Sequence, residues 1–214
     1  MSNDFIIAID GPSASGKGTI ARKLADHFRL PYLDTGLLYR WVALSLKSQN
    51  KAADDIDAAR NAAIHLRQNI ITISFDDPEL RGHAISQPSS MVAAMPEVRR
   101  ELVELQQSFA NQAGGAVLDG RDIGTVIAPH AKIKLFITAS AEKRAERRFK
   151  ELQNKGQTTT YDAVLTDLQA RDARDETRTT APSKIAVDAV KLDTSDLNVD
   201  EAFAAALKIV NSFR

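Results

Sequence analysis

A phosphate-binding loop near the N-terminus constrains this chain more than any other feature. An apolar run at residues 5–9 leads into a glycine-bounded loop with a lysine, and a helical pattern follows over residues 20–28. In such a strand–loop–helix unit, successive backbone N–H groups surround an anion, and the positive end of the helix dipole faces it. We therefore predict that a nucleoside triphosphate binds at Gly11, Pro12, Ser13, Ala14, Ser15, Gly16, Lys17, Gly18 and Thr19.

The second half of this loop departs from the usual P-loop pattern. A Ser or Thr normally follows the Gly-Lys pair, and its hydroxyl binds Mg²⁺. Here Gly18 takes that position and Thr19 comes one residue later. The metal ligands are therefore unknown from the sequence. The Gly-Lys-Gly-Thr order is typical of nucleoside monophosphate kinases rather than of GTPases or motor ATPases.

Composition excludes several other classes of protein. The 214 residues allow one domain with insertions or two small domains. Lys and Arg (28) balance Asp and Glu (28), which argues against a general nucleic-acid or membrane-surface binder. There is no cysteine, no apolar run approaches the ~20 residues of a membrane span, and residues 1–4 lack the basic start of a signal peptide. We expect a cytoplasmic, monomeric protein that acts on small molecules.

The order of apolar segments predicts an α/β fold with a doubly wound, mainly parallel sheet. Candidate strands at residues 5–9, 32–33, 116–118, 133–137 and 189–192 alternate with helical patterns. Between the second and third of these strands the pattern of apolar and polar residues changes. Ile71 and Ile73 alternate with polar residues, and residues 83–86 form a candidate hairpin partner. We therefore expect an α+β insertion within the parallel core.

Charged residues follow two of the candidate strands. Asp119, Arg121 and Asp122 come directly after the strand at 116–118, and ligands of open α/β sheets bind at this end of the strands. A carboxylate there can organise Mg²⁺ or accept a proton, and an arginine can bind a phosphate. Thr35 follows the strand at 32–33 and is expected to cap the next helix. Arg40 lies one turn further along, where it faces an anion or simply solvent.

An arginine-rich helix near residue 175 is a further candidate. Arg171, Asp175 and Arg178 share one helix face by their spacing. Surface ion pairing explains that pattern as well as phosphate binding does, and both alternatives stay open on the pattern alone. Arg144, Arg147 and Arg148 form a second basic face of the same kind.

Taken together, these motifs resemble those of bacterial cytidylate kinases over essentially the whole chain. The resemblance rests on the loop at 11–19, on residues 33–40 and 90–99, on the Asp-Gly-Arg-Asp-Ile-Gly-Thr stretch at 119–125, and on residues 171–175. It implies a transferase of pyrimidine metabolism that moves the γ-phosphoryl group of ATP to CMP or dCMP with the help of Mg²⁺. It implies a P-loop core (1–33, 115–142 and 179–214), a monophosphate-binding insertion (34–114) and a helical lid (143–178).

The resemblance also implies roles for single residues. Ser90, Arg99 and Asp122 would read the cytosine edge, and Asp175, with Arg171 nearby, would contact the pentose. The substrate-binding set is then Thr35, Arg40, Ser90, Arg99, Arg121, Asp122, Arg171, Asp175 and Arg178. The catalytic set is Lys17, Asp119, Arg121, Arg171 and Arg178. Position 35 is usually Ser in this family, and Thr35 keeps the hydroxyl.

Three alternatives remain open from the sequence. A P-loop kinase for another small acceptor would lack the base-reading trio Ser90, Arg99 and Asp122. A regulatory GTPase would need a guanine-reading Asn-Lys-x-Asp, which the stretch Asn154-Lys155-Gly156-Gln157 does not complete. A nucleotide sensor without catalytic activity would need no second phosphate site, and the arginine-rich helix argues against it.

Overall fold

One parallel sheet organises the computed structural model, which describes residues 5–213. In this part of the chain, β1 (Ile6–Asp10), β2 (Tyr32–Asp34), β3 (Ala116–Gly120), β4 (Ile133–Thr138) and β5 (Val190–Asp193) run in the order β2-β3-β1-β4-β5. All neighbouring pairs are parallel. This confirms the predicted doubly wound core. Residues 1–4, where we expected no signal peptide, and residue 214 lie outside the described part.

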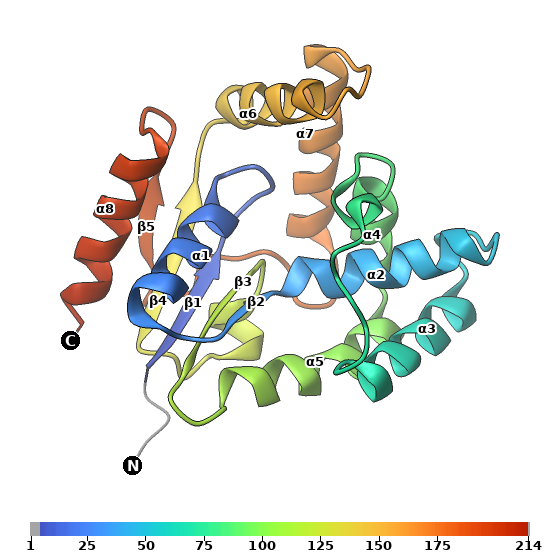
Figure 1. Ribbon diagram of the computed structural model, residues 1–214, viewed down its shortest axis with the longest axis horizontal. Coiled ribbons are helices and arrows are strands. Elements are labelled where there is room, and N and C mark those ends of the chain that lie inside the picture. Colours follow the sequence, from blue (N-terminus) through green and yellow to red (C-terminus); the bar gives the residue numbers. More distant parts are fainter. Residues whose placement is uncertain (1–4, 214) are drawn as a thin grey trace.

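Helices connect and cover these strands (Figure 1). They are α1 (Lys17–Phe28), α2 (Thr35–Ser48), α3 (Ile56–Asn69), α4 (Ser86–Val92), α5 (Pro96–Ala110), α6 (Ala141–Asn154), α7 (Tyr161–Thr177) and α8 (Val199–Asn211). A 3-10 turn, η1 (Pro78–Arg81), and a π-helical turn, η2 (Ile123–Ile127), complete the elements. None of the helices within residues 5–213 is long and apolar enough to cross a membrane.

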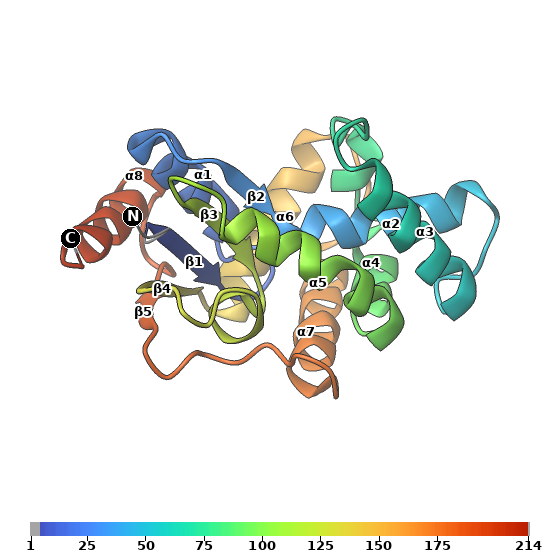
Figure 2. The same ribbon diagram turned by 90° about the horizontal axis from the view of Figure 1, so that it is seen from below.

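The first strand is apolar throughout because both of its faces are covered. Ile7 and Ile9 pack against α1 and α8, while Ile6 and Ala8 pack against η2 and the end of α5. Figure 2 shows α1 and α8 on one side of the sheet. A strand buried on both faces loses the alternation of polar and apolar residues, which is why residues 5–9 read as a continuous apolar run.

The insertion between β2 and β3 differs from the prediction, because the described part of it contains no strand. Helices α2, α3, α4 and α5 surround their own apolar core instead. Ile73 and Phe75 rest on that core from an irregular segment, while Ile71 is 97% exposed. Residues 83–86 form a turn that leads into α4 rather than a hairpin partner. The alternation at 71–75 therefore reflects an extended segment lying on helices, with no neighbouring strand to supply ladder hydrogen bonds.

Helices α6 and α7 pack together at one end of the sheet, and in the view of Figure 1 α6 runs across the top while α7 runs downward. Leu152, Val164 and Leu168 bury one face of the pair, and Ala14 of the phosphate loop packs against it. From this pair α7 descends beside α4, to which it is joined by hydrogen bonds such as that from Arg174 Nη1 to Gln87 Oε1 (2.8 Å). Thus α7 connects the phosphate loop with the insertion.

Candidate active site

The phosphate loop requires glycine at two of its positions. Gly11 has φ 149°, and a Cβ there would lie 2.0 Å from the backbone oxygen of Ile137. Gly16 has φ 86° and is the N-cap residue of α1, so that Lys17 begins the helix. Both conformations suit glycine because no Cβ obstructs them. The loop therefore turns tightly around the N-terminus of α1, as the sequence predicted.

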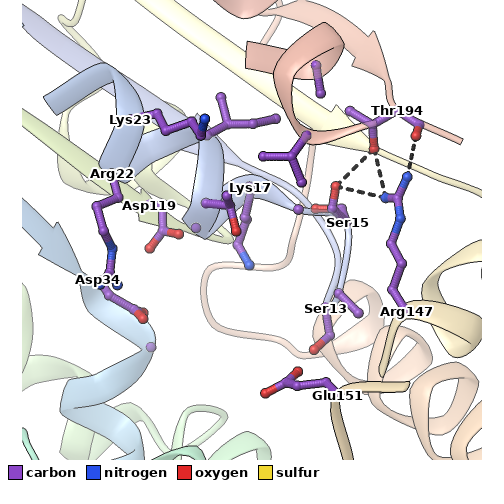
Figure 3. Close-up of a pocket in the computed structure, with 18 of the residues that line it drawn as sticks. Ser13, Ser15, Lys17, Arg22, Lys23, Asp34, Asp119, Arg147, Glu151 and Thr194 are labelled. Carbon is purple, nitrogen blue, oxygen red and sulfur yellow. Dashed lines mark hydrogen bonds between the residues drawn. The ribbon is translucent and has the colours of Figure 1, made fainter. Parts of the chain in front are cut away.

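A cavity of about 940 Å³ opens over this loop. Its walls come from the phosphate loop, the ends of β2 and β3, the start of α2, and both helices α6 and α7. Figure 3 shows Lys17 projecting from the loop, with Asp34 and Asp119 to one side and Glu151 of α6 toward another. The ends of parallel strands and one helix N-terminus thus meet at a single cavity, which is where an open α/β sheet binds ligands.

The charges at the centre of the cavity are strongly perturbed. Burial, followed by the positive charge of Arg121, lowers the pKa of Lys17 to about 8. Burial, followed by the negative charge of Asp34, raises the pKa of Asp119 to about 7. Asp119 is only 3% exposed, and its Oδ1 has no hydrogen-bond partner among the described residues. Titratable groups with opposed shifts in one cavity are typical of a site that handles charge.

Gly18 allows the Asp119 carboxylate to approach the loop. A Cβ at position 18 would lie 3.1 Å from Asp119 Oδ2 and 3.7 Å from the hydroxyl of Tyr32. A Ser or Thr there would press on the carboxylate. Within residues 5–213, no group of three or more His, Cys, Asp or Glu side chains could hold a metal ion. Mg²⁺ commonly binds through one or two carboxylates together with substrate phosphates, and Asp119 with Asp34 fits that pattern.

Part of the cavity wall is formed by arginines from α2, the end of β3 and α7. Arg40, Arg121 and Arg171 all line the cavity. Burial, followed by the charge of Arg148, lowers the pKa of Arg40 to about 10. Burial, followed by the charge of Arg121, lowers the pKa of Arg171 to about 9. Like charges brought together in this way repel one another, so the wall favours a bound anion that neutralises them.

A second set of predicted residues lies behind this wall, buried and paired with one another. Asp122 forms an ion pair with Arg99, and Arg178 Nη2 lies 3.6 Å from Asp122 Oδ1. Arg121 Nε donates to Asp175 Oδ2 (3.0 Å), and Ser90 Oγ donates to Asp175 Oδ1 (3.3 Å). These residues do not line the cavity. The structure therefore places Arg40, Arg121 and Arg171 on its wall, and Ser90, Arg99, Asp122, Asp175 and Arg178 in an adjoining network.

The chain is similar to known proteins over nearly its whole length. A family model described as cytidylate kinase matches residues 7–212. The chain belongs to the cytidylate kinase family. The cytidylate kinase of Methylocella silvestris is 54% identical over 208 residues, covering 97% of this chain and 94% of that protein. The cytidylate kinase of Brucella suis is 50% identical over 207 residues, covering 97% and 93%.

Among solved structures the likeness extends to the fold alone. An uncharacterized protein from Eubacterium ventriosum superimposes with a TM-score of 0.52 at 15% identity, covering 97% of this chain and 98% of that one. A likeness at this level supports the α/β architecture and carries no functional detail.

Thr35 does not cap α2, although its position after the strand at 32–33 predicted that it would. The N-cap residue of α2 is Asp34, whose side chain makes no capping hydrogen bond. The Thr35 hydroxyl instead donates to the backbone oxygen of Asp119 (2.8 Å), and a Cβ on Gly120 would lie 2.6 Å from it. The close packing of α2 against the end of β3 turns this hydroxyl toward the sheet, away from the helix N-terminus.

Several contacts in this member of the cytidylate kinase family were not predicted. Arg144 Nη1 donates to the backbone oxygen of Ser13 (3.2 Å), and Arg147 Nη1 donates to Thr194 Oγ1 (3.1 Å), which itself donates to the Ser15 oxygen (3.0 Å). These bonds anchor α6 on the phosphate loop (Figure 3). The basic face of α6 was visible in the sequence, but nothing there distinguished its anchoring arginines from solvated ones.

Proposed function

We propose that this chain transfers the γ-phosphoryl group of ATP to CMP or dCMP, giving ADP and CDP or dCDP. Membership of the cytidylate kinase family supports both the reaction and the acceptor. The observation that carries the proposal is the cavity lined by both the phosphate loop and the arginines Arg40, Arg121 and Arg171, with the predicted base-reading residues in the adjoining network. Two nucleotides bound there would present their phosphates to each other.

On the donor side, the backbone N–H groups of the loop and Lys17 hold the outer phosphates of ATP. Loop amides and the α1 dipole supply positive charge that needs no reorganisation during the reaction. Lys17 carries its charge on a flexible stem and can follow the transferred group. Phosphoryl transfer demands little covalent help from the protein, so positioning and neutralisation of charge account for most of its contribution.

On the acceptor side, Arg40, Arg121 and Arg178 hold the monophosphate, and Asp175 with Arg171 contacts the pentose. Ser90, Arg99 and Asp122 recognise cytosine, whose amino donor lies beside ring acceptors. Uracil reverses one of these positions and would leave a buried group without a partner, which is costly. The ion pair of Arg99 with Asp122 supports this assignment, because it holds both groups in one place before any base arrives.

Mg²⁺ is the expected companion of ATP, and Asp119 with Asp34 would hold it through oxygen ligands. When bound, the ion would neutralise phosphate charge and orient the donor. Asp119 is the better candidate of the two, because it is buried and has an oxygen without a partner among the described residues.

The three-part organisation also remains a proposal. Residues 1–33, 115–142 and 179–214 would form the core, 34–114 the acceptor insertion, and 143–178 the lid. The separate apolar cores of the insertion and of α6–α7 support these divisions. Because one chain supplies every residue in this account, we propose a monomer as the active form, acting in the cytoplasm among free nucleotides.

A panel of nucleoside monophosphates tests the acceptor directly. ADP release from ATP should be fastest with CMP and dCMP, and UMP, AMP and GMP should be much poorer acceptors. Equal use of UMP or AMP would contradict the cytosine assignment and favour a P-loop kinase for another acceptor. Tight binding of ATP without any ADP release across the panel would instead favour a nucleotide sensor.

A further inference from the structure

Asp10, the last residue of β1, has a role that none of the sequence motifs assigns to it. It is only 4% exposed and immediately precedes Gly11 of the phosphate loop. Its two carboxylate oxygens accept the backbone N–H groups of Ile123 and Gly124, both at 2.8 Å. These two amides begin the π-helical turn η2, which directly follows Asp122. A carboxylate from one strand thus caps a helical turn that starts at the end of another.

Asp122 occupies the N-cap position of η2 but does not cap it. Aspartate at an N-cap normally accepts an N–H group from the second or third helical residue, which here means Gly124 or Thr125. The Asp122 side chain makes no such bond and pairs with Arg99 and Arg178 instead. Its backbone oxygen still accepts the first bond of the turn, from Val126 (2.9 Å). Asp10 accepts two of the free N–H groups of the turn, those of Ile123 and Gly124.

We infer that Asp10 is a positioning residue for acceptor selection, because it caps η2 in place of Asp122 and so leaves the Asp122 carboxylate free for Arg99 and the cytosine. This inference rests on the proposed function, in which Asp122 reads the base. Without Asp10, the amides of Ile123 and Gly124 would lack an acceptor inside the protein. The nearest carboxylate in an N-cap position is that of Asp122, and turning toward these amides would take it away from Arg99.

The surroundings of Asp10 leave little room for another arrangement. A Cβ on Gly124 would lie 3.4 Å from Asp10 Oδ2 and 3.2 Å from Cδ of Lys134, so the start of η2 is packed closely on the carboxylate. Burial raises the pKa of Asp10 to about 6, and the two amide donors act against that rise. The carboxylate is therefore ionised at neutral pH, when both of its oxygens are needed as acceptors.

Asp10→Asn is the test, because asparagine keeps the shape and only one acceptor oxygen. Its amide group would face one of the two N–H donors and leave it unpaired. We expect kcat/KM for CMP to fall about tenfold or more while kcat/KM for UMP changes little, so the CMP-to-UMP preference falls by a similar factor. The KM for ATP should stay within about twofold, although Asp10 adjoins the phosphate loop. An equal loss with CMP and UMP, or a larger change in the KM for ATP, would overturn the inference.

Two controls separate positioning from general destabilisation. Asp188→Asn removes the carboxylate that pairs with buried Lys134 (2.8 Å) and should lower the melting temperature without changing the CMP-to-UMP preference. The double variant Asp10→Asn/Asp122→Asn should show no further loss of preference beyond Asp122→Asn alone, since both act through one carboxylate. Independent, multiplying losses of preference in the double variant would overturn the inference.

The outcome also distinguishes this inference from the proposed function. If Asp122→Asn alone keeps the full CMP-to-UMP preference, the base-reading role of Asp122 fails, and with it the premise. If Asp122→Asn loses the preference and Asp10→Asn keeps it, only the inference fails. Should Asp10→Asn not fold, Asp10→Ser, which is smaller and retains one acceptor, should show the same loss of preference. Wild-type preference in that variant would overturn the inference.

Discussion

The two walls of the cavity are built in different ways. The donor wall is the loop of residues 11–19, which turns tightly because Gly11 and Gly16 adopt backbone angles that suit glycine. The acceptor wall and its adjoining network use side chains from α2, α4, α5, the end of β3 and α7. They extend from Thr35 to Arg178. The first wall depends on local conformation, and the second depends on how the insertion and the lid pack against the core.

This difference determines which binding contacts a single substitution can remove. Only proline removes a backbone N–H group, so most substitutions in the loop leave these donors in place, and Lys17 is its one charged side chain. Every contact on the acceptor side belongs to a side chain and can be removed separately. Apart from the glycines that shape the loop, single substitutions should therefore affect donor chemistry chiefly at Lys17 and acceptor selection at several positions.

Lys17→Ala should have the largest effect of any single change. Removing the mobile charge at the transferred group should lower kcat by about a thousandfold or more. Since burial lowers the pKa of Lys17 to about 8, the folded protein disfavours the charged form, and its loss should leave the melting temperature unchanged or higher. Coupled ADP release and thermal melting measure both effects.

A matched control for Lys17→Ala is Lys150→Ala, which removes an exposed lysine of α6 paired with Glu146 (2.8 Å). That variant should keep wild-type turnover and stability. Near wild-type kcat in Lys17→Ala would refute the role of the loop as the donor site.

Asp119→Asn, at the place where the two walls meet, should raise the stability of the protein while lowering its activity. The folded-state pKa of Asp119 is about 7, above its ordinary value of 3.8, so the ionised carboxylate destabilises the folded protein. This cost is complete above pH ~7, shrinks as the pH falls through that value, and vanishes below pH ~4. At pH ~8 we expect the variant to be more stable by about 4 kcal/mol, with strongly reduced activity.

Urea unfolding at several pH values measures the Asp119→Asn effect. The stability advantage should disappear between pH ~7 and pH ~4. Asp193→Asn is the control at the end of β5: a hydrogen bond from Ser195 lowers the pKa of Asp193, so its loss should bring no gain in stability. An Asp119→Asn variant that is less stable than wild type at high pH would contradict the electrostatic account of this site.

The sequence predicted the donor wall better than the acceptor wall, because the first depends on local conformation and the second on long-range packing. The loop at 11–19, its flanking strand and helix, and the parallel sheet follow from short-range patterns, and the structure confirms them. The buried partners do not: Thr35 bonds to the Asp119 oxygen across 84 positions, and Asp10 reaches η2 across more than 110. Such contacts depend on which strand ends lie side by side. The hairpin expected near Ile71 failed similarly, because alternation cannot show whether a partner strand exists.

Asp122→Asn should change the preference for the acceptor nucleotide without changing the binding of ATP. The amide keeps the shape but weakens the pairing with Arg99 and with the cytosine amino group. We expect kcat/KM for CMP to fall about 10- to 30-fold, with little change for UMP and an unchanged KM for ATP. Initial rates at varied CMP, UMP and ATP measure these three quantities.

Asp172→Asn is the control for Asp122→Asn, since Asp172 also pairs with an arginine, Arg144 (2.6 Å), but on the side of the phosphate loop. It should leave the CMP-to-UMP preference unchanged. A uniform loss across both acceptors in Asp122→Asn would place Asp122 among general structural residues rather than at the base.

Substitutions of Thr35 should have the smallest effect. They test the hydrogen bond that links the start of α2 to the end of β3. Thr35→Ser keeps the hydroxyl that donates to the Asp119 oxygen, so kcat/KM for CMP should stay within about twofold of wild type. Thr35→Val keeps the shape but removes the donor, and should cost about 1 kcal/mol of stability and lower kcat/KM by about threefold to fivefold. Because the hydroxyl supports the strand end that carries both Asp119 and Arg121, the loss should be equal for CMP and UMP. A loss confined to CMP would mean that Thr35 reaches the base itself rather than supporting the end of β3.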